Sequence, residues 1–293
     1  MKKLSALFTV GALALTLGAC SSSNAPAASS DKTSSASSAD ASTSELTTLT
    51  VGATTSPHGI ILEEAKPLLA EKGINLEIVE FSDYPNINPS TSDGSLDANY
   101  FQHEPYLISY DGDNKYAEGD EGYLVSAGAI HYEPLGIYSA KHASIDEIED
   151  GAQVVVPNDA TNEARALYLL EDQGWITLSD EATISTATIY DIVDNPKNLD
   201  IVEVAADQIA SKLPDIDFGV INGNYALTSG VTDKLLVTEA DDSEAAQTYQ
   251  NIIAVKESKK DDPAIQALVE VLKSDEIRDF ITNEFEGAAV PAK

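Results

Sequence analysis

The sequence predicts an α/β protein with two lobes. Short runs rich in Val, Ile, Leu and Phe alternate with segments in which apolar residues recur every three or four positions, a pattern typical of strands and helices around parallel sheets. The chain has 293 residues, enough for two domains of ordinary size. Strands near residues 130–137 and 248–256 are expected to cross between the lobes as a hinge. We therefore expect lobe one at 47–133 plus 253–293 and lobe two at 134–252, each a mixed sheet flanked by helices.

The first expected elements form a β-α-β unit. A strand at Leu49–Ala53 is followed by apolar residues at helical spacing over 61–69, and then by a strand at Leu76–Phe81. Such a unit places its two strands parallel in one sheet. Gly73 is expected to end the helix, and Pro67 is expected to kink it.

Two predictions concern the ends of strands in the middle of the chain. Leu96–Tyr100 is expected to end a strand that runs into a loop and a new helix, because Pro105 interrupts the segment. Tyr123–Ile130 and Leu135–Ser139 are expected to form a long apolar strand pair, interrupted by Tyr-Glu-Pro between them.

The same alternation continues toward the C-terminus. The expected strands are Gln153–Val156, Ile201–Val204, Phe218–Ile221 and Asn251–Val255, and the expected helices lie at about 159–173, after Ala206, after Gly223 and in two segments that end near Phe285. Gly174 is placed to end the first of these helices. Asp262-Pro263 is a favourable cap and first residue for the last helical region.

The N-terminal residues predict secretion and lipid attachment. Two lysines precede an apolar run over 4–17 and small residues, the arrangement of a signal peptide over residues 1–19. The run is shorter than the ~20 residues of a membrane-spanning helix. Leu-Gly-Ala-Cys resembles the bacterial lipobox, whose cysteine is lipidated, and Cys20 is the single cysteine of the chain. Residues 20–46, rich in Ser, Ala and Thr, then predict a disordered tether.

The charge of the chain excludes two classes of partner. There are 17 Lys and Arg residues against 49 Asp and Glu, which gives a net charge of −32. Without a basic surface the chain is not expected to bind nucleic acid or anionic lipid headgroups. We therefore expect Cys20 to attach the protein to the cell membrane, with the folded part on the extracytoplasmic face.

No common catalytic or cofactor motif is complete in the sequence. His103-Glu104 begins the zinc pattern H-E-x-x-H, but position 107 is Leu. The acidic loop at 111–114 imitates part of a calcium loop, yet Lys115 and Tyr116 stand where an oxygen ligand and Gly are needed. G-x-S-x-G and the phosphate loop G-x-x-x-x-G-K do not occur. We therefore predict no enzyme activity, no catalytic residue, no metal and no cofactor.

Two features are candidates for a binding site. The string DANYFQHEPY at 97–106 gathers aromatic residues and His103 near the end of an expected strand, where binding sites often lie; an aromatic patch in the core is the alternative. Arg165, one of two arginines, lies near the start of a helix that follows a buried strand. Its guanidinium is suited to hold a carboxylate by two hydrogen bonds, and an internal salt bridge is the alternative.

Four strings carry a family resemblance. They are DANYFQHEPYL at 97–107, VPNDATNEARALYLL at 156–170, DNPKNLDIVE at 194–203 and VINGNYA at 220–226. Together, and in this order, they resemble the NlpA-type methionine-binding lipoproteins of ABC importers, and the similarity covers essentially all of residues 46–293. The resemblance implies a type II periplasmic-binding-protein fold, in which two hinged lobes close over a free amino acid.

The resemblance also implies a set of ligand contacts. Arg165 matches the arginine that takes the ligand carboxylate, with Asn162 on the same face of the helix. Asn222 and Tyr225 match polar contacts from the last strand-to-helix turn of lobe two. The aromatic wall around a thioether side chain is matched by Tyr84, Phe101, His103 and Tyr106. A thioether sulfur gains roughly 0.3–1.5 kcal/mol beside an aromatic ring.

The function implied by the resemblance is capture of L-methionine and its delivery to the permease of an ABC importer. One alternative is the same fold binding D-methionine, another small amino acid or a short peptide. A further alternative is a lipid-anchored surface adhesin without a transport role, for which the acidic surface and the tether are the supporting features.

Overall fold

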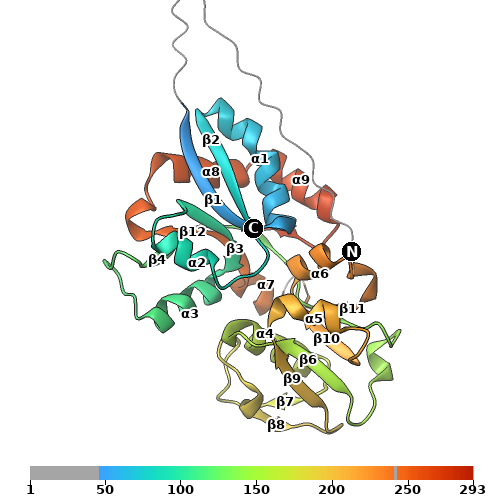
Figure 1. The fold of residues 1–293 in the computed structure, drawn as a ribbon. Helices are drawn as coiled ribbons and strands as arrows, with labels where there is room; N and C mark the ends of the chain where they lie inside the picture. Colours follow the sequence, from blue (N-terminus) through green and yellow to red (C-terminus); the bar gives the residue numbers. More distant parts are fainter. Residues whose placement is uncertain (1–45, 241–242, 293) are drawn as a thin grey trace, which may run out of the picture. The chain divides into compact units, whose positions relative to one another are not determined.

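The computed structural model describes residues 46–240 and 243–292. The predicted signal peptide, the predicted lipidation site Cys20 and the predicted tether up to residue 45 lie outside these described residues. Within the described residues, no helix is both long and apolar enough to cross a membrane. Figure 1 shows that the strands form two main sheets, each with its own helices.

The first sheet has six strands in the order β13-β4-β12-β3-β1-β2. β1 runs parallel to β2 and β3, whereas β12 runs antiparallel to β3 and β4. The sheet is therefore mixed, as expected. Its strands are β1 (Thr47–Thr54), β2 (Ile74–Phe81), β3 (Ala98–His103), β4 (Leu124–Tyr132), β12 (Gln250–Lys256) and β13 (Val290–Pro291).

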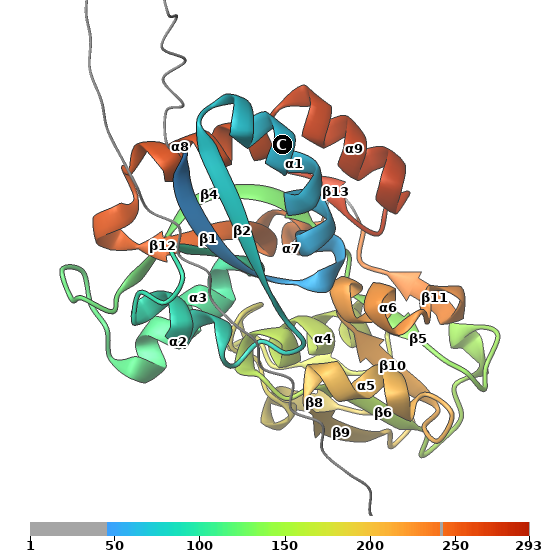
Figure 2. The same cartoon turned by 45° about the horizontal axis from the view of Figure 1, so that its top comes forward.

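Helices cover both faces of the first sheet (Figure 2). They are α1 (Ile60–Glu71), α2 (Ile87–Ser92), α3 (Glu104–Asn114), α8 (Pro263–Leu272) and α9 (Asp275–Phe285). Ile253 of β12 belongs to the core formed with α1, α8 and α9, whereas its neighbours Ile252 and Ala254 pack with Leu107 of α3. This alternation follows from the period of two in a strand, which directs successive side chains to opposite faces.

The second sheet has five strands in the order β11-β5-β10-β6-β9. β6 runs parallel to β9 and β10, and β5 runs antiparallel to β10 and β11. Val154 and Val156 of β6 share a core with α4, whereas Val155 shares one with α5 on the opposite face. The elements are β5 (Gly136–Tyr138), β6 (Gln153–Pro157), α4 (Ala160–Asp172), β9 (Asp200–Val204), α5 (Ala206–Lys212), β10 (Phe218–Ile221), α6 (Gly223–Ser229) and β11 (Leu235–Thr238), with the small pair β7 (Thr177–Leu178) and β8 (Ile192–Asp194) and the short α7 (Glu244–Thr248).

The predicted β-α-β unit and helix ends are present. β1, α1 and β2 follow one another with β1 and β2 parallel, and α1 continues through Pro67. Gly73 and Gly174 follow the ends of α1 and α4 with φ of +80° and +69°. Glycine adopts this left-handed conformation without the steric cost that a side chain would bring, so both helices end where the sequence predicted.

Two predictions about the middle of the chain are wrong. β4 and β5 do not pair with each other: β4 belongs to the first sheet and β5 to the second, because the chain crosses between the sheets there. The loop expected after Tyr100 is also absent, because a strand and a helix follow one another directly there. β3 continues to His103 and α3 begins at Glu104. Pro105 lies in the first turn of α3, where a missing N–H removes no helical hydrogen bond.

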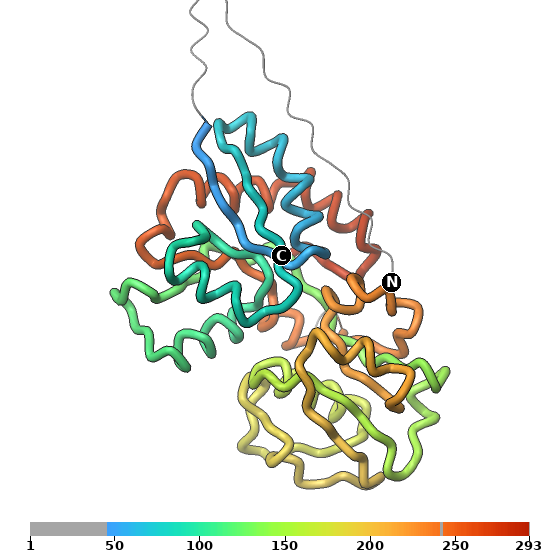
Figure 3. Tube along the Cα trace, viewed as in Figure 1, coloured from blue at the N-terminus to red at the C-terminus, as the bar shows by residue number. Residues whose placement is uncertain are grey.

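The chain passes twice between the sheets. In Figure 3 the red C-terminal segment returns to the blue N-terminal part, and the yellow segments lie away from it. The first passage joins β4 to β5, and the second leads from β11 to β12. We propose that the two sheets are the centres of lobe one and lobe two, with the return to lobe one at Gln250, where β12 begins, rather than at residue 253.

Candidate ligand-binding site

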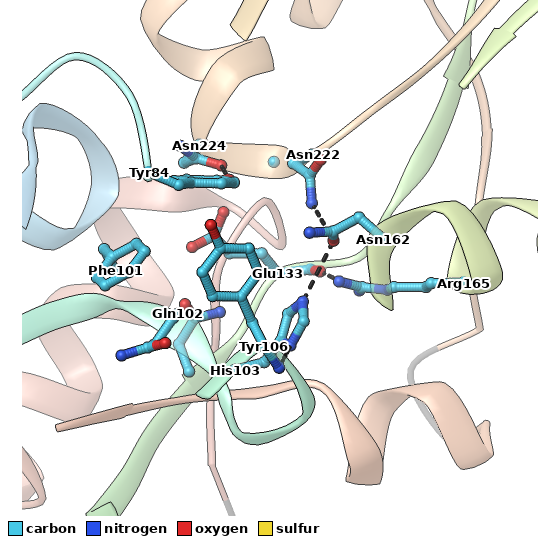
Figure 4. A pocket seen from close by; sticks show the side chains of 12 residues that line it. Tyr84, Phe101, Gln102, His103, Tyr106, Glu133, Asn162, Arg165, Asn222 and Asn224 are labelled. Atoms are coloured by element: carbon cyan, nitrogen blue, oxygen red, sulfur yellow. Dashed lines mark hydrogen bonds between the residues drawn. The ribbon is translucent and has the colours of Figure 1, made fainter. Parts of the chain in front are cut away.

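A pocket lies where side chains of the two lobes meet (Figure 4). About 340 Å³ of space free of protein atoms lies among its lining residues, including space open to solvent. The lining residues are Tyr84, Phe101, Gln102, His103, Tyr106, Glu133, Asn162, Arg165, Asn222, Gly223, Asn224 and Asn251. Seven of the eight implied ligand contacts are among them. The eighth, Tyr225, packs behind the lining, with its ring centroid 4.8 Å from that of Tyr84.

Ends of strands bring these residues together. His103 ends β3, Glu133 directly follows β4, and Asn222 directly follows β10. Asn162 and Arg165 lie in the first turns of α4, shortly after β6 ends. The loops at the carboxyl ends of parallel strands are the usual place for ligand sites in α/β proteins.

A chain of hydrogen bonds fixes the orientation of two amides. Asp159 caps α4 by accepting from the backbone N–H of Asn162 at 3.0 Å, and it also accepts from Asn162 Nδ2 at 2.9 Å. Asn162 Oδ1 is therefore an acceptor, and Asn222 Nδ2 donates to it at 2.7 Å. The remaining atom, Asn222 Oδ1, is buried and has no partner among the described residues. A buried acceptor of this kind favours a ligand that donates a hydrogen bond.

His103 joins the two lobes through the same amide. Its Nδ1 accepts from the backbone N–H of Tyr106 at 3.2 Å, which caps α3 and leaves the ring proton on Nε2. Nε2–H then donates to Asn162 Oδ1 at 3.2 Å. Burial lowers the pKa of His103 to about 3, and the charge of Arg165 adds to this effect. The ring is therefore neutral at neutral pH and acts as a hydrogen-bond donor across the pocket.

Arg165 forms an internal salt bridge and also lines the pocket. Nε and Nη2 donate to the two carboxylate oxygens of Glu239 at 2.8 and 2.6 Å, and Nη2 also donates to the backbone oxygen of Glu133 at 2.7 Å. The internal salt bridge is thus present. Nη1 takes part in none of these three bonds, and the side chain also lines the pocket. Burial lowers the pKa of Arg165, but the charge and hydrogen bonds of Glu239 together with Tyr132 outweigh this effect, so the net shift is upward and the guanidinium keeps its charge.

Glu133 is a lining residue that the sequence analysis missed. Its side chain is 6% exposed, and its Oε1 lies 2.8 Å from His131 Nε2 and 3.3 Å from His58 Nε2. Burial raises the pKa of Glu133. A buried carboxylate in a pocket is stabilised by a cationic ligand group. The sequence feature that could have indicated Glu133 is its position as an acidic residue between two apolar strand segments, where the chain is expected to cross between the lobes.

The aromatic residues form one cluster on one side of the pocket. The ring centroid of Tyr84 lies 5.6 Å from that of Phe101 and 5.7 Å from that of Tyr106, and the Tyr84 hydroxyl donates to Asn224 Oδ1 at 2.6 Å. Phe101, Tyr84 and Tyr225 also belong to a buried apolar cluster that includes residues of both lobes. The two interpretations of the aromatic string are therefore compatible, because these rings are part of a core and of the pocket wall.

Two α/β lobes, each contributing polar side chains to a pocket between them, define a solute-binding protein of the periplasmic-binding-protein type. The chain belongs to the NlpA lipoprotein family, whose model matches residues 49–293. This membership agrees with the resemblance stated from the four strings.

Similar proteins support the same family. The chain is 40% identical over 245 residues to a protein of Bacillus subtilis named "Methionine-binding lipoprotein MetQ", covering 83% of this chain and 87% of that protein. A crystal structure of a Ruminococcus gnavus lipoprotein is 48% identical, with a TM-score of 0.80 and coverage of 84% and 99%. A nutrient-binding protein of Burkholderia cenocepacia, solved bound to methionine, is 38% identical, with a TM-score of 0.77 and coverage of 84% and 100%.

Proposed function

We propose that the protein captures methionine between its lobes and delivers it to the permease of an ABC importer. The observation that carries the proposal is a buried pocket with a guanidinium, a carboxylate and an aromatic wall around one small space. These groups match the three parts of methionine. The name of the Bacillus subtilis relative and the methionine in the Burkholderia cenocepacia structure support this ligand.

The polar groups suit the charges of a free amino acid. Arg165 Nη1 makes none of the bonds to Glu239 and Glu133, and we assign it to the ligand carboxylate. Glu133 and the unpaired Asn222 Oδ1 suit the ammonium group. Because burial of an ion requires a paired, hydrogen-bonded counter-charge, such a pocket favours a zwitterion over an uncharged solute. Tyr84, Phe101 and Tyr106 suit the thioether.

Calorimetric titration of ligand-stripped protein tests the proposal. L-Methionine is compared with the amine that lacks its carboxylate and with the acid that lacks its amino group. Leaving one buried charge unpaired costs about 3–5 kcal/mol, so each analogue should bind about two to three and a half powers of ten more weakly. D-Methionine and norleucine in the same series test stereochemistry and the sulfur atom. Equal binding of methionine and either truncated analogue contradicts the proposal.

Attachment through Cys20 is part of the proposed function and has its own test. Cys20 is the single thiol of the chain and follows the lipobox-like string. We expect Cys20→Ala to leave the protein unprocessed or to move it to the soluble fraction, because a thiol is required for the lipid bond. Cell fractionation with metabolic labelling by a fatty acid measures both effects. Unchanged cleavage and membrane recovery of the variant would argue against this attachment.

A further inference from the structure

A buried network of hydrogen bonds lies behind Glu133. His131 is on β4, and His58 is in the short turn Thr55–Gly59 between β1 and α1. Both histidine side chains are 0% exposed, and neither is among the residues that line the pocket. Their Nε2 atoms converge on the same oxygen, Glu133 Oε1, at 2.8 Å for His131 and 3.3 Å for His58. The two rings therefore contact the pocket through Glu133.

The partners of the rings determine where the ring protons lie. The hydroxyl of Tyr100 is bonded to Nδ1 of His131, and the hydroxyl of Thr54 is 2.7 Å from Nδ1 of His58. A hydroxyl can donate to either Nδ1, whereas the atoms that face Nε2, namely Glu133 Oε1 and Asn251 Oδ1, are acceptors. The protons are therefore on both Nε2 atoms. Burial lowers the pKa of His58 to about 4 and that of His131 to about 3, so both rings are neutral donors.

The second oxygen of Glu133 lies beside Gly223, a residue of the pocket wall. A methyl group added at Gly223, a lining residue, would come within 2.9 Å of Glu133 Oε2. Oε1 is thus occupied by the two imidazoles, while Oε2 lies beside a residue of the pocket wall. Without these donors the backbone N–H of Asn224 would make the remaining hydrogen bond to the carboxylate among the groups that lower its pKa, and the desolvation of Oε1 would not be compensated.

We propose that His131 and His58 are positioning residues that hold Glu133 by Oε1 and so direct Oε2 to the ammonium group of the ligand. The inference rests on the proposed function, since it assigns the recognition of the amino group. His131 contributes more than His58, because it is closer to Oε1 and does not share its proton with Asn251. The network thereby selects α-amino acids over the corresponding acids without an amino group.

A metal site is the competing interpretation of the same three residues. His58, His131 and Glu133 each offer a ligand atom, and these atoms lie within 4.8 Å of one another. All four ring nitrogens already have protein partners. A metal would displace the protons of both Nε2 atoms. Each of these nitrogen atoms already takes part in the hydrogen-bonded network. The observations therefore favour a role in positioning Glu133 over a role in binding a metal.

The test compares the affinities of methionine and of its amino-free acid in each variant. His131→Leu removes the donor, whereas His131→Gln can donate to Glu133 and accept from Tyr100. We expect His131→Leu to weaken methionine binding by about ten- to a hundred-fold, the range of one hydrogen bond to a charged group. Binding of the amino-free acid should change by less than about threefold, which is under 1 kcal/mol. His131→Gln should restore most of the discrimination.

The ratio of the methionine affinity to the affinity of the amino-free acid separates a loss of Glu133 positioning from a loss of folding. Partial unfolding would weaken the binding of both ligands by the same factor and leave the ratio unchanged. If His131→Leu does not fold, Tyr100→Phe, which removes only the hydroxyl behind His131, should give a smaller loss of the same ratio. An unchanged ratio in both variants overturns the inference. So does a rise in melting temperature of the wild type with ZnCl₂ that His131→Gln lacks. If the wild type binds neither ligand, or both equally, the proposed function itself fails.

Discussion

Arg165→Ala should both destabilise the protein and abolish tight methionine binding. The substitution leaves Glu239 buried, 4% exposed at its side chain, without its guanidinium partner. Removal of one partner of a buried pair typically costs about 3–5 kcal/mol. It also removes Nη1, the group that we assign to the ligand carboxylate, so binding should weaken by about two to three and a half powers of ten. Denaturant unfolding measures the first effect, and calorimetry measures the second.

A double substitution separates the two roles of Arg165. Replacing both partners of a buried pair by apolar residues is often neutral or stabilising, so Arg165→Met with Glu239→Leu should recover much of the stability lost in Arg165→Ala. Methionine binding should remain weak, since neither new side chain can hold a carboxylate. Arg165→Lys should bind with intermediate affinity, because one ammonium cannot reproduce the planar fork.

The control for charge is the other arginine. Arg278 donates to the backbone oxygen of Ala292 near the C-terminus and is not among the pocket residues. We expect Arg278→Ala to leave the methionine affinity within about threefold of the wild type, which is under 1 kcal/mol. If the stable double variant binds methionine as tightly as the wild type, Arg165 serves only the salt bridge with Glu239.

Glu133→Gln should weaken methionine binding by about the same factor as Arg165→Ala, without lowering the stability of the ligand-free protein. Burial raises the pKa of Glu133, so burying its charge costs free energy in the ligand-free protein, and removing the charge relieves that cost. The ammonium of the ligand depends on the negative charge of Glu133. A carboxamide can still accept from His131, but it presents an N–H to the ligand in place of an oxygen. We expect a loss of about 3–5 kcal/mol of binding free energy and an unchanged or higher melting temperature.

Glu163→Gln is the matched control for this variant. Glu163 is also buried, burial raises its pKa to about 6, and its Oε1 accepts from the backbone N–H of Ile189 at 3.0 Å, away from the pocket. Its replacement should leave methionine affinity unchanged. Equal affinities of Glu133→Gln and Glu163→Gln, measured by calorimetry at neutral pH, would refute the assignment of Glu133 to the ammonium group.

The sequence by itself determined the features that depend on short stretches of chain. Alternating strand and helix periods predicted the β-α-β unit at the start of the first sheet, and Gly174 marked the end of α4, because its φ of +69° is a local requirement. The family strings carried Arg165 and the aromatic residues of the pocket. These signals lie within one element or one turn, where spacing and residue type are sufficient.

Only the tertiary structure decided which distant residues meet. β5 lies in the second sheet and not beside β4, since strand pairing depends on where the chain crosses between lobes. Glu239 is separated from Arg165 by 74 positions, and no periodicity relates them. Glu133 lines the pocket, and His58 from a turn and His131 from β4 converge on it from other parts of the chain. Burial and ion pairing are properties of the packed fold, so a linear pattern of residues does not contain them.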